Sequence, residues 1–560
     1  MATMTGSQYL AQFLDAYGTS HVFYVPAAMI PALVQMHQRG ITCVNVHSEK
    51  AAAYMADGYA RVSHRPGVCI AQTVGAANLA VGLRDAYLAG SPVIALTGGR
   101  LPETKYRHVY QEIEDHPIFE PLTKFNVQVD TVSRLPDLLR QGFRAATIGN
   151  PAPVHLELAG FLGQILEDEV ELDLVAEPRY ASCPAYRPAT DPQHVRDALR
   201  VLTGAQRPVI VAGGGVATSG AQVELVQLAR LLDIPVATSL NAKGAINEND
   251  PLSIGVVGFY SRVCTNRIVS EADLVFYIGS HTGSQVTHEW RVPPFGTSVI
   301  QLDIEPVELG RNYPNVVSLC GDARTVLRQM IDVASVSASR GAWTSRGQEL
   351  VTAWRKEVRP LCHSDAVPIR PERLCTELTR ALPTDSIVVS GTGHAGMWAA
   401  MYIELTEPSQ TFIRAAGSLG WALPAAIGAK CAAPERPVIC FCGDGGFYYH
   451  LAELETAARY GIQVVVVVNN NHAYNQELEL FADACGGRQE SGFEMWQFNE
   501  VNLASVTESF GCVGIRVEHP DQIAPALRRA LSCDRPVVVD VATDIEALAP
   551  LAWGPGVEPN

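Results

Sequence analysis

Two short segments late in the chain carry oxygen ligands at a spacing that suits a metal ion. The first is Cys442-Gly-Asp-Gly-Gly-Phe447, and the second is the valine run 464–468 followed by the asparagines 469–471. A carboxylate and an amide oxygen are ligands that Mg²⁺ accepts, and the ion usually keeps places for phosphate oxygens and water. Gly445 and Gly446 have no side chain to hold a phosphate at a distance. The pattern therefore predicts a magnesium site that binds a diphosphate.

A strand, a helix and a second strand must position these ligands. Residues 437–442 form an apolar run, residues 449–460 have the spacing of an amphipathic helix, and residues 463–468 are almost all β-branched. Such a helix rises ~18 Å and such a strand spans ~20 Å, so a right-handed crossover returns the chain to the same sheet. Adjacent parallel strands lie ~4.8 Å apart, and we expect Asp444 and an asparagine to meet at neighbouring strand ends.

These residues resemble the signature of the thiamine diphosphate enzymes of the acetolactate synthase and pyruvate decarboxylase group, which is Gly-Asp-Gly, a helix and a strand, then Asn-Asn. By this resemblance Asp444 and Asn471 supply side-chain ligands to Mg²⁺, and Ala473 supplies a backbone carbonyl. The run of three asparagines leaves Asn470 as the alternative to Asn471. The resemblance also implies cofactor contacts from Gly443, Gly445, Gly446, Ala473 and Tyr474.

Two upstream segments extend the resemblance. Residues 416–428, which begin Ala-Gly-Ser-Leu-Gly-Trp, resemble the family segment that holds the aminopyrimidine ring. Leu419 would then be the wedge that bends the cofactor into a V shape, and the Gly417 carbonyl would accept a hydrogen bond from the ring's amino group. Ser390-Gly-Thr-Gly-His-Ala395 matches the family's first diphosphate loop, which implies cofactor contacts from Gly393 and His394.

Near the amino terminus, His47 to Arg61 resembles the family helix whose glutamate, here Glu49, contacts a pyrimidine nitrogen. That contact would stabilise the tautomer in which the cofactor's own amino group removes a proton from the thiazolium carbon. A carboxyl in this role should be poorly solvated, and the alanine-rich helix can supply apolar walls. Gln111 matches a family glutamine near the reacting centre. The simpler alternatives are a solvated helix face for Glu49 and an ordinary surface position for Gln111.

Composition favours a large enzyme over a nucleic-acid-binding or membrane protein. With 560 residues, 47% of them hydrophobic, the chain can hold about three domains with cores of their own. A net charge of -16 without a basic run argues against nucleic acid, and no apolar run is long enough to cross a bilayer. Thirteen cysteines without a Cys-x-x-Cys pair, and a start without an export signal, predict reduced thiols in a cytoplasmic protein.

We expect an α/β fold with three doubly wound parallel-sheet domains. These are a pyrimidine-binding domain at 1–180, a middle domain at 188–335, a diphosphate-binding domain at 365–545 and a tail at 546–560. An acidic and proline-rich stretch at 167–188 marks the first boundary, and a serine-rich stretch at 335–345 marks the second. The glycine-containing segment 475–499, together with the tail, is expected to form a lid.

The middle domain raises the question of a second cofactor. Glycines 213–215 follow an expected strand, which leaves open a bound nucleotide portion from FAD or from CoA/ADP. Asp303 and Glu305 would then be the candidates for ribose contacts. Acetolactate synthases carry an arginine-rich loop against flavin, and residues 279–285 lack it, which argues against FAD.

The resemblance implies an enzyme that makes or breaks a bond next to a carbonyl, either a carboligase or a decarboxylase of 2-oxo acids, similar to acetolactate synthase. A 2-hydroxyacyl-CoA lyase, which gives an aldehyde or ketone and formyl-CoA, is the alternative, and a cofactor-binding protein without catalysis is another. In the family the cofactor lies between two chains. We therefore expect a homodimer or homotetramer in which Glu49 of one subunit faces the diphosphate held by its partner.

Overall fold

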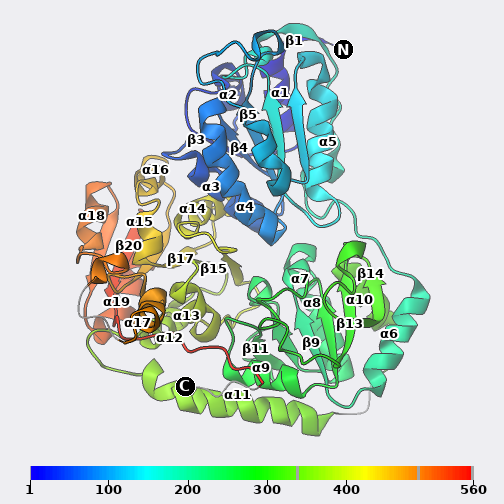
Figure 1. Ribbon diagram of the computed structural model, residues 1–560, viewed down its shortest axis with the longest axis vertical. Helices are drawn as coiled ribbons and strands as arrows, with labels where there is room; N and C mark the ends of the chain where they lie inside the picture. The colour runs from blue at the N-terminus through cyan, green and yellow to red at the C-terminus, as the bar shows by residue number, and fades with distance from the viewer. Residues whose placement is uncertain (1, 336–339, 488–491, 556–560) are drawn as a thin grey trace.

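The computed structural model describes residues 2–335, 340–487 and 492–555, and it contains three α/β units, each built on a six-stranded parallel sheet (Figure 1). The predicted fold class is confirmed. Parts of three predicted segments lie outside the described residues, namely the break at 335–345, the loop at 475–499 and the tail at 546–560.

The first unit has the strand order β3-β2-β4-β5-β7-β6. Its strands are β2 (His21–Tyr24), β3 (Thr42–Asn45), β4 (Gly67–Ala71), β5 (Val93–Gly98), β6 (Phe125–Val129) and β7 (Val154–Leu158). Its helices are α1 (Gly6–Ala16), α2 (Ile30–Gln38), α3 (Glu49–Ser63), α4 (Ala76–Ala89) and α5 (Leu135–Thr147). The antiparallel strands β1 (Ala2–Thr5) and β8 (Glu169–Leu172) pair beside this sheet. Strands β4, β5 and β7 are buried along their whole length, as expected for a parallel sheet covered by helices on both faces.

The middle unit has the order β11-β10-β9-β12-β13-β14, which is the strand order typical of dinucleotide-binding sheets. Its strands are β9 (Pro208–Ala212), β10 (Val236–Thr238), β11 (Ser253–Val256), β12 (Leu274–Ile278), β13 (Ser298–Asp303) and β14 (Asn315–Cys320). Its helices are α6 (Pro192–Gly204), α7 (Gly214–Ser219), α8 (Gln222–Leu232), α9 (Val263–Glu271) and α10 (Ala323–Val333). The long helix α11 (Gly341–Cys362) then runs along the base of the molecule to the third unit (Figure 1).

The third unit has the order β16-β15-β17-β18-β20-β19, which repeats the connectivity of the first. Its strands are β15 (Ile387–Ser390), β16 (Thr411–Arg414), β17 (Val438–Gly443), β18 (Val465–Asn470), β19 (Val513–Val517) and β20 (Val537–Ala542). Its helices are α12 (Pro371–Ala381), α13 (His394–Tyr402), α14 (Ala422–Ala432), α15 (Asp444–Tyr448), α16 (Glu453–Arg459), α17 (Leu478–Ala484), α18 (Leu503–Ser509) and α19 (Pro520–Leu531). Strands β17 and β18 are direct neighbours, with Gly443 opposite Asn469, so the predicted strand-helix-strand arrangement is confirmed.

The helix predicted over 449–460 is wrong in its extent. Within this range the structure has only the shorter helix α16, and a turn at 449–452 separates α16 from α15, which ends at Tyr448. In this turn the His450 Nδ1 atom donates to the carbonyl oxygen of Gly420 at 2.9 Å. A contact with a distant loop therefore interrupts a helix that the local sequence pattern favours.

The first and third units pack tightly through helices α3 and α14. A Cβ atom at Gly58 would lie 2.1 Å from the carbonyl oxygen of Ala425, and one at Gly428 would lie 1.9 Å from that of Met55. The two helices approach to backbone contact because small residues face each other across them. The alanines that the sequence places around Glu49 therefore form an interface between units.

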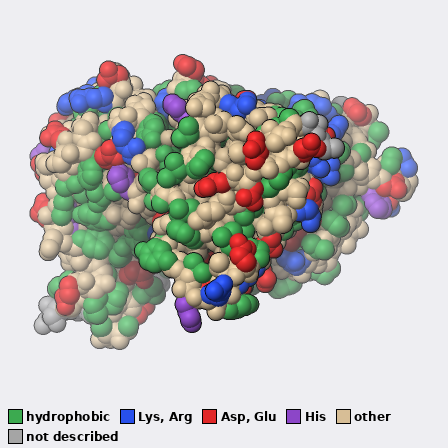
Figure 2. All heavy atoms as spheres, turned by 90° about the horizontal axis from the view of Figure 1, so that it is seen from above, with side chains coloured by type: hydrophobic (Ala, Val, Ile, Leu, Met, Phe, Trp, Pro, Cys, Tyr) green, Lys and Arg blue, Asp and Glu red, His purple; other side chains and the backbone are tan. Residues whose placement is uncertain are grey.

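Further observations concern the thiols, the lengths and apolarity of the helices, and the surface. All thirteen cysteines are free thiols. Within the described part of the chain, no helix combines the length and apolarity needed to cross a membrane. Figure 2 shows acidic, basic and apolar side chains interspersed on the face that it presents.

Candidate cofactor site

A cavity of about 390 Å³ opens at the carboxyl ends of β15 and β17. The chain leaves these neighbouring strands in opposite directions, since β16 lies beyond β15 and β18 lies beyond β17. Ligands of doubly wound sheets bind in the crevice that such a reversal creates. The lining comes from four stretches, within 391–395, 417–423, 442–447 and 469–477, and from Tyr260.

The structure brings Asp444 and Asn471 to this one cavity. Asp444 Oδ2 accepts a hydrogen bond from the backbone N–H of Ala473 at 3.1 Å, which ties the two loops together. Asn470 is used elsewhere, because its Nδ2 atom donates to Asp540 Oδ1 at 2.7 Å. This geometry favours Asn471 over Asn470 as the metal ligand that we propose below.

The charge at the site suits a divalent cation. Asp444 is 2% exposed, and burial raises its pKa to about 7. No lysine or arginine is found among the described residues that line the cavity. The buried Oδ1 atom of Asn469 also finds no hydrogen-bond partner within the described part of the protein. Buried oxygen ligands that lack a cation are what a bound Mg²⁺ would satisfy.

The glycines of the site serve three purposes. Gly393 has φ 66° and ψ −150°, a conformation that only glycine adopts readily, at the turn into α13. A Cβ atom at Gly417 or Gly443 would meet no atom within 4 Å, so these residues leave room for a ligand. A Cβ atom added at Gly446 would have the Gly420 nitrogen as its nearest atom, at 3.8 Å. A Cβ atom added at Gly445 would lie only 2.5 Å from the Tyr474 ring. Gly445 is therefore needed for packing against Tyr474.

The remaining predicted side chains of the site also line the cavity. These are Leu419, His394 and Tyr474. The His394 Nδ1 atom is hydrogen-bonded to Asn475 Oδ1, and burial lowers the pKa of His394, which favours its neutral form. Tyr474 packs edge-on against Phe498, with ring centroids 4.8 Å apart.

The lining residues that sequence reasoning missed include Tyr260 and Asn469. Tyr260 comes from the middle unit, and no local pattern in the sequence connects it with the third unit. Asn469 belongs to the asparagine run, and the alternation of side chains along a strand is a sequence signal that could have placed it at the cavity. Since side chains alternate along a strand, Asn469 and Asn471 share one side while Asn470 takes the other.

Glu49 and Gln111 are not among the described residues that line this cavity. Glu49 begins α3, and its Oε2 atom accepts a hydrogen bond from Asn78 Nδ2 at 3.3 Å. Gln111 has φ 62°, and its buried amide oxygen has no partner in the described part of the protein. It lines a separate cavity of about 120 Å³ with Arg100 and Phe161. Within one chain, the structure does not bring these two predicted residues to Asp444.

Comparison with known proteins agrees with the geometry. Family models for thiamine pyrophosphate enzymes, another name for thiamine diphosphate enzymes, match three parts of the chain. They are the N-terminal TPP binding domain at residues 4–118, the central domain at 195–330 and the C-terminal TPP binding domain at 391–541.

Relatives match along almost the whole chain. A probable acetolactate synthase large subunit of Methanococcus aeolicus is 33% identical, over 97% of this chain and 92% of its own length. The acetolactate synthase large subunit of Corynebacterium glutamicum is 30% identical, over 96% of this chain and 86% of its own. The acetolactate synthase isozyme 3 large subunit of Escherichia coli is 29% identical, over 97% of this chain and 96% of its own length. The chain therefore belongs to the thiamine pyrophosphate enzymes and is a thiamine diphosphate-dependent carboligase or lyase.

Proposed function

We propose that this protein is a magnesium-dependent carboligase that acts on 2-oxo acids in the manner of acetolactate synthase. The observation that supports it most is the convergence of Asp444, Asn471 and the Ala473 loop on one cavity at the sheet reversal. Relatives named acetolactate synthase, which align with nearly the whole chain, support the choice of substrate class.

Each part of the cavity has a role in this proposal. Asp444, Asn471 and the carbonyl of Ala473 would hold Mg²⁺, while Gly443 and Gly446 leave room for the diphosphate. Leu419 would fix the bend between the two rings. Bound thiamine diphosphate supplies the carbon nucleophile and the electron sink. The chain orients that group and keeps water away from it.

The reaction that follows can be assayed directly. One pyruvate would lose CO₂, and the remaining two-carbon fragment would form a bond with the carbonyl carbon of a second pyruvate. We expect acetolactate from pyruvate, thiamine diphosphate and Mg²⁺, at a rate that chelation of the metal abolishes. Release of an aldehyde from a 2-hydroxyacyl-CoA, with no acetolactate from pyruvate, would instead support the lyase alternative. Equal, blank-level rates for wild type and Glu49→Gln on both substrate classes would support the non-catalytic alternative.

The choice between two adjacent asparagines can be tested by substitution. Asn471→Ala should weaken Mg²⁺-dependent cofactor binding about tenfold or more, because it removes a ligand of the ion. Asn470→Ala should leave ion affinity nearly unchanged and cost ~1–3 kcal/mol in the free energy of unfolding, because it leaves the buried Asp540 short of a donor. Calorimetric titration and urea unfolding measure the two quantities. The reverse pattern would assign the metal to Asn470.

A nucleotide in the middle unit is the second part of the proposal. A cavity of about 330 Å³ lies at the β9/β12 reversal, lined by Gly214, Gly215, Gly279 and Asp303. A nucleotide portion of CoA/ADP or FAD fits this position in a sheet of this strand order. Asp303, which lines the cavity, remains our candidate for a contact with the ribose of the nucleotide. Glu305 does not line the cavity, and its Oε1 atom accepts the backbone N–H of Asn150 at 2.7 Å.

Mass spectrometry of freshly purified, denatured protein tests this second part. We expect an adenine-containing compound, either FAD or a CoA/ADP species, in addition to thiamine diphosphate. The species observed would also decide between the two classes, since FAD and CoA/ADP differ in mass. Thiamine diphosphate as the sole small molecule would contradict the nucleotide proposal and leave the carboligase proposal intact.

The final part of the proposal is that the active site lies between two chains, in a homodimer or homotetramer. Glu49 does not reach the diphosphate cavity of its own chain. The adjacent helix α4 and the turn before it expose apolar side chains, with Val74 and Val81 each more than half exposed. An exposed apolar surface beside a catalytic carboxylate is what a second copy would cover.

A further inference from the structure

Helix α13 connects the cofactor cavity with the middle unit. Its first residues lie at the cavity, since Gly393, His394 and Ala395 belong to the lining. The first N–H groups of a helix have no partner within the helix, and they favour a negatively charged ligand. Over nine residues the helix extends about 14 Å away from this point. The other end of α13 is therefore well removed from the cavity.

Two cations from the middle unit meet that other end. Lys243 Nζ donates to the carbonyl oxygen of Ala400 at 3.3 Å, and Arg262 Nε donates to that of Met401 at 2.9 Å. The last carbonyls of a helix lack partners within it, and positive charges there complement the helix dipole. Helix α13 has no basic residue in its own last turn. The middle unit thus supplies basic side chains at the carboxyl-terminal end of α13, where α13 has none of its own.

A single carboxylate holds the two cations in place. Glu248 accepts from Lys243 Nζ at 2.5 Å and from Arg262 Nη2 at 2.8 Å. All three side chains are at most 6% exposed, so two basic side chains and one carboxylate are buried together. Glu404, which is partly exposed, lies 3.4 Å from Arg262, and the Arg262 guanidinium stacks on Trp354, 4.7 Å from its ring centroid. The cations are therefore fixed in position and not free to move toward solvent.

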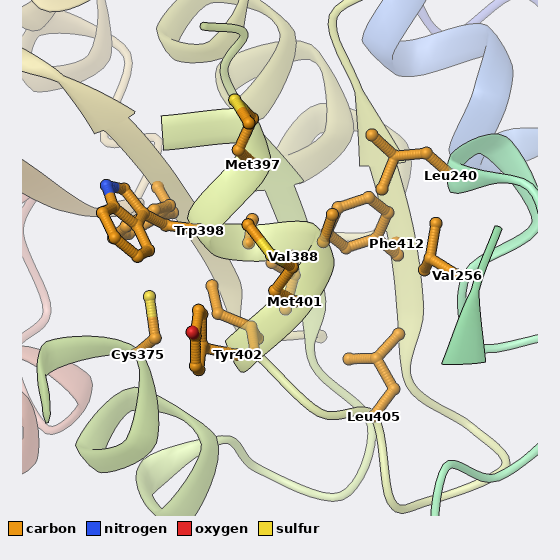
Figure 3. Close-up of a cluster of buried hydrophobic side chains, with 14 of the residues drawn as sticks. Leu240, Val256, Cys375, Val388, Met397, Trp398, Met401, Tyr402, Leu405 and Phe412 are labelled. Carbon is orange, nitrogen blue, oxygen red and sulfur yellow. The ribbon is translucent and has the colours of Figure 1, made fainter. Parts of the chain in front are cut away.

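Apolar packing alone already joins the two units at this point. Figure 3 shows Leu240 and Val256 of the middle unit beside Phe412 and Leu405 of the third unit, close to Met401 on α13. Burying charged groups is costly compared with burying apolar ones of the same size. A contact that served only to hold the units together would not need three buried ionic side chains.

We propose that Lys243 and Arg262 are positioning residues for the cofactor's diphosphate, which act through α13 from its far end. They hold the carboxyl-terminal carbonyls of the helix and place positive charge there, which keeps its amino-terminal N–H groups aimed at the anion. The inference rests on the proposed function, because it takes the 391–395 loop as a diphosphate contact. It assigns Lys243 and Arg262 of the middle unit a part in thiamine diphosphate affinity, although neither of them lines the cofactor cavity.

Titration of the apoprotein with thiamine diphosphate and Mg²⁺, and separately with inorganic pyrophosphate and Mg²⁺, tests the proposal. Lys243→Met should raise both dissociation constants about three- to thirtyfold, while kcat at saturating cofactor stays within about twofold of wild type. Lys243→Arg should restore most of the affinity, because it returns a cation to the same carbonyl. Should Lys243→Met fail to fold, Lys243→Gln removes the same charge but keeps a polar group beside Glu248, and it should show the same weakening.

The matched control is Glu224→Gln. Glu224 is also a buried carboxylate of the middle unit, but it pairs with Arg324 and Arg328 on α10 and makes no contact with α13. Its loss should leave both dissociation constants unchanged. Wild-type affinity in folded Lys243→Met or in Lys243→Gln, or equal weakening by Glu224→Gln, would overturn the inference while leaving the proposed function in place. A wild-type protein that binds no thiamine diphosphate would overturn both.

Discussion

Replacing Glu49 with glutamine is expected to lower kcat at least ~100-fold while thiamine diphosphate affinity changes only a few-fold. The substitution keeps the shape of the side chain and removes the proton that we expect Glu49 to share with the pyrimidine ring. Acid–base catalysis of this kind contributes ~10²–10⁴ in rate. Steady-state rates give kcat, and hydrogen–deuterium exchange at the thiazolium carbon, followed by NMR, reports on the proton transfer alone. Exchange at the wild-type rate in Glu49→Gln would remove Glu49 from the mechanism.

The same variant tests whether the site is shared between chains. Glu49→Gln and Asp444→Ala chains should each be inactive alone, yet mixed dimers should contain one intact site, made of Glu49 from one chain and Asp444 from the other. With random pairing about 25% of wild-type activity should return when the two are co-expressed. No recovery, in dimers shown by sedimentation to have formed, would place both residues in one chain's site.

Asp444→Ala is expected to have the largest effect on cofactor binding. Loss of the carboxylate that we propose as a ligand of the ion should weaken Mg²⁺-dependent thiamine diphosphate binding by ~100-fold or more. The apoprotein should lose little stability, because burial disfavours the ionised carboxylate, raising its pKa to about 7, and this offsets the loss of the acceptor for the Ala473 N–H. Titration calorimetry and thermal unfolding of the cofactor-free protein give the two results.

Asp540→Asn is the variant with which the stability of Asp444→Ala is compared. This buried carboxylate accepts hydrogen bonds from Arg516, Asn470 and the backbone of Leu503, each at 2.7–2.8 Å. Its replacement should lower the free energy of unfolding by ~1–3 kcal/mol. An Asp444→Ala apoprotein that is destabilised as strongly as Asp540→Asn would mean that Asp444 is a structural residue.

The local part of the site could be predicted from the sequence. The glycines around Asp444 sit at the end of a buried strand, and the valine run before the asparagines forms the neighbouring strand, because both signals depend on residues close in the chain. The resemblance to a known family added Leu419, Gly417 and the 390–395 loop, and the structure places Leu419, Gly417 and residues 391–395 at the same cavity.

The parts that could not be predicted depend on distant contacts. Tyr260 reaches the cavity from another unit, and the hydrogen bond from His450 to Gly420 interrupts an expected helix. The contact of Lys243 with α13 joins residues 157 positions apart in the chain. The separation of Asn470 from Asn471 required knowledge of where β18 ends, since a one-residue shift moves every side chain of a strand to the other face.

The position of the metal ion tests the central claim most directly. Crystals grown with thiamine diphosphate and Mn²⁺ in place of Mg²⁺ would locate the ion by its anomalous scattering. We predict one ion within ~2.0–2.4 Å of oxygens from Asp444, Asn471 and the Ala473 carbonyl, bridging to the diphosphate. A diphosphate bound in another place, or an ion that contacts neither Asp444 nor Asn471, would contradict the account.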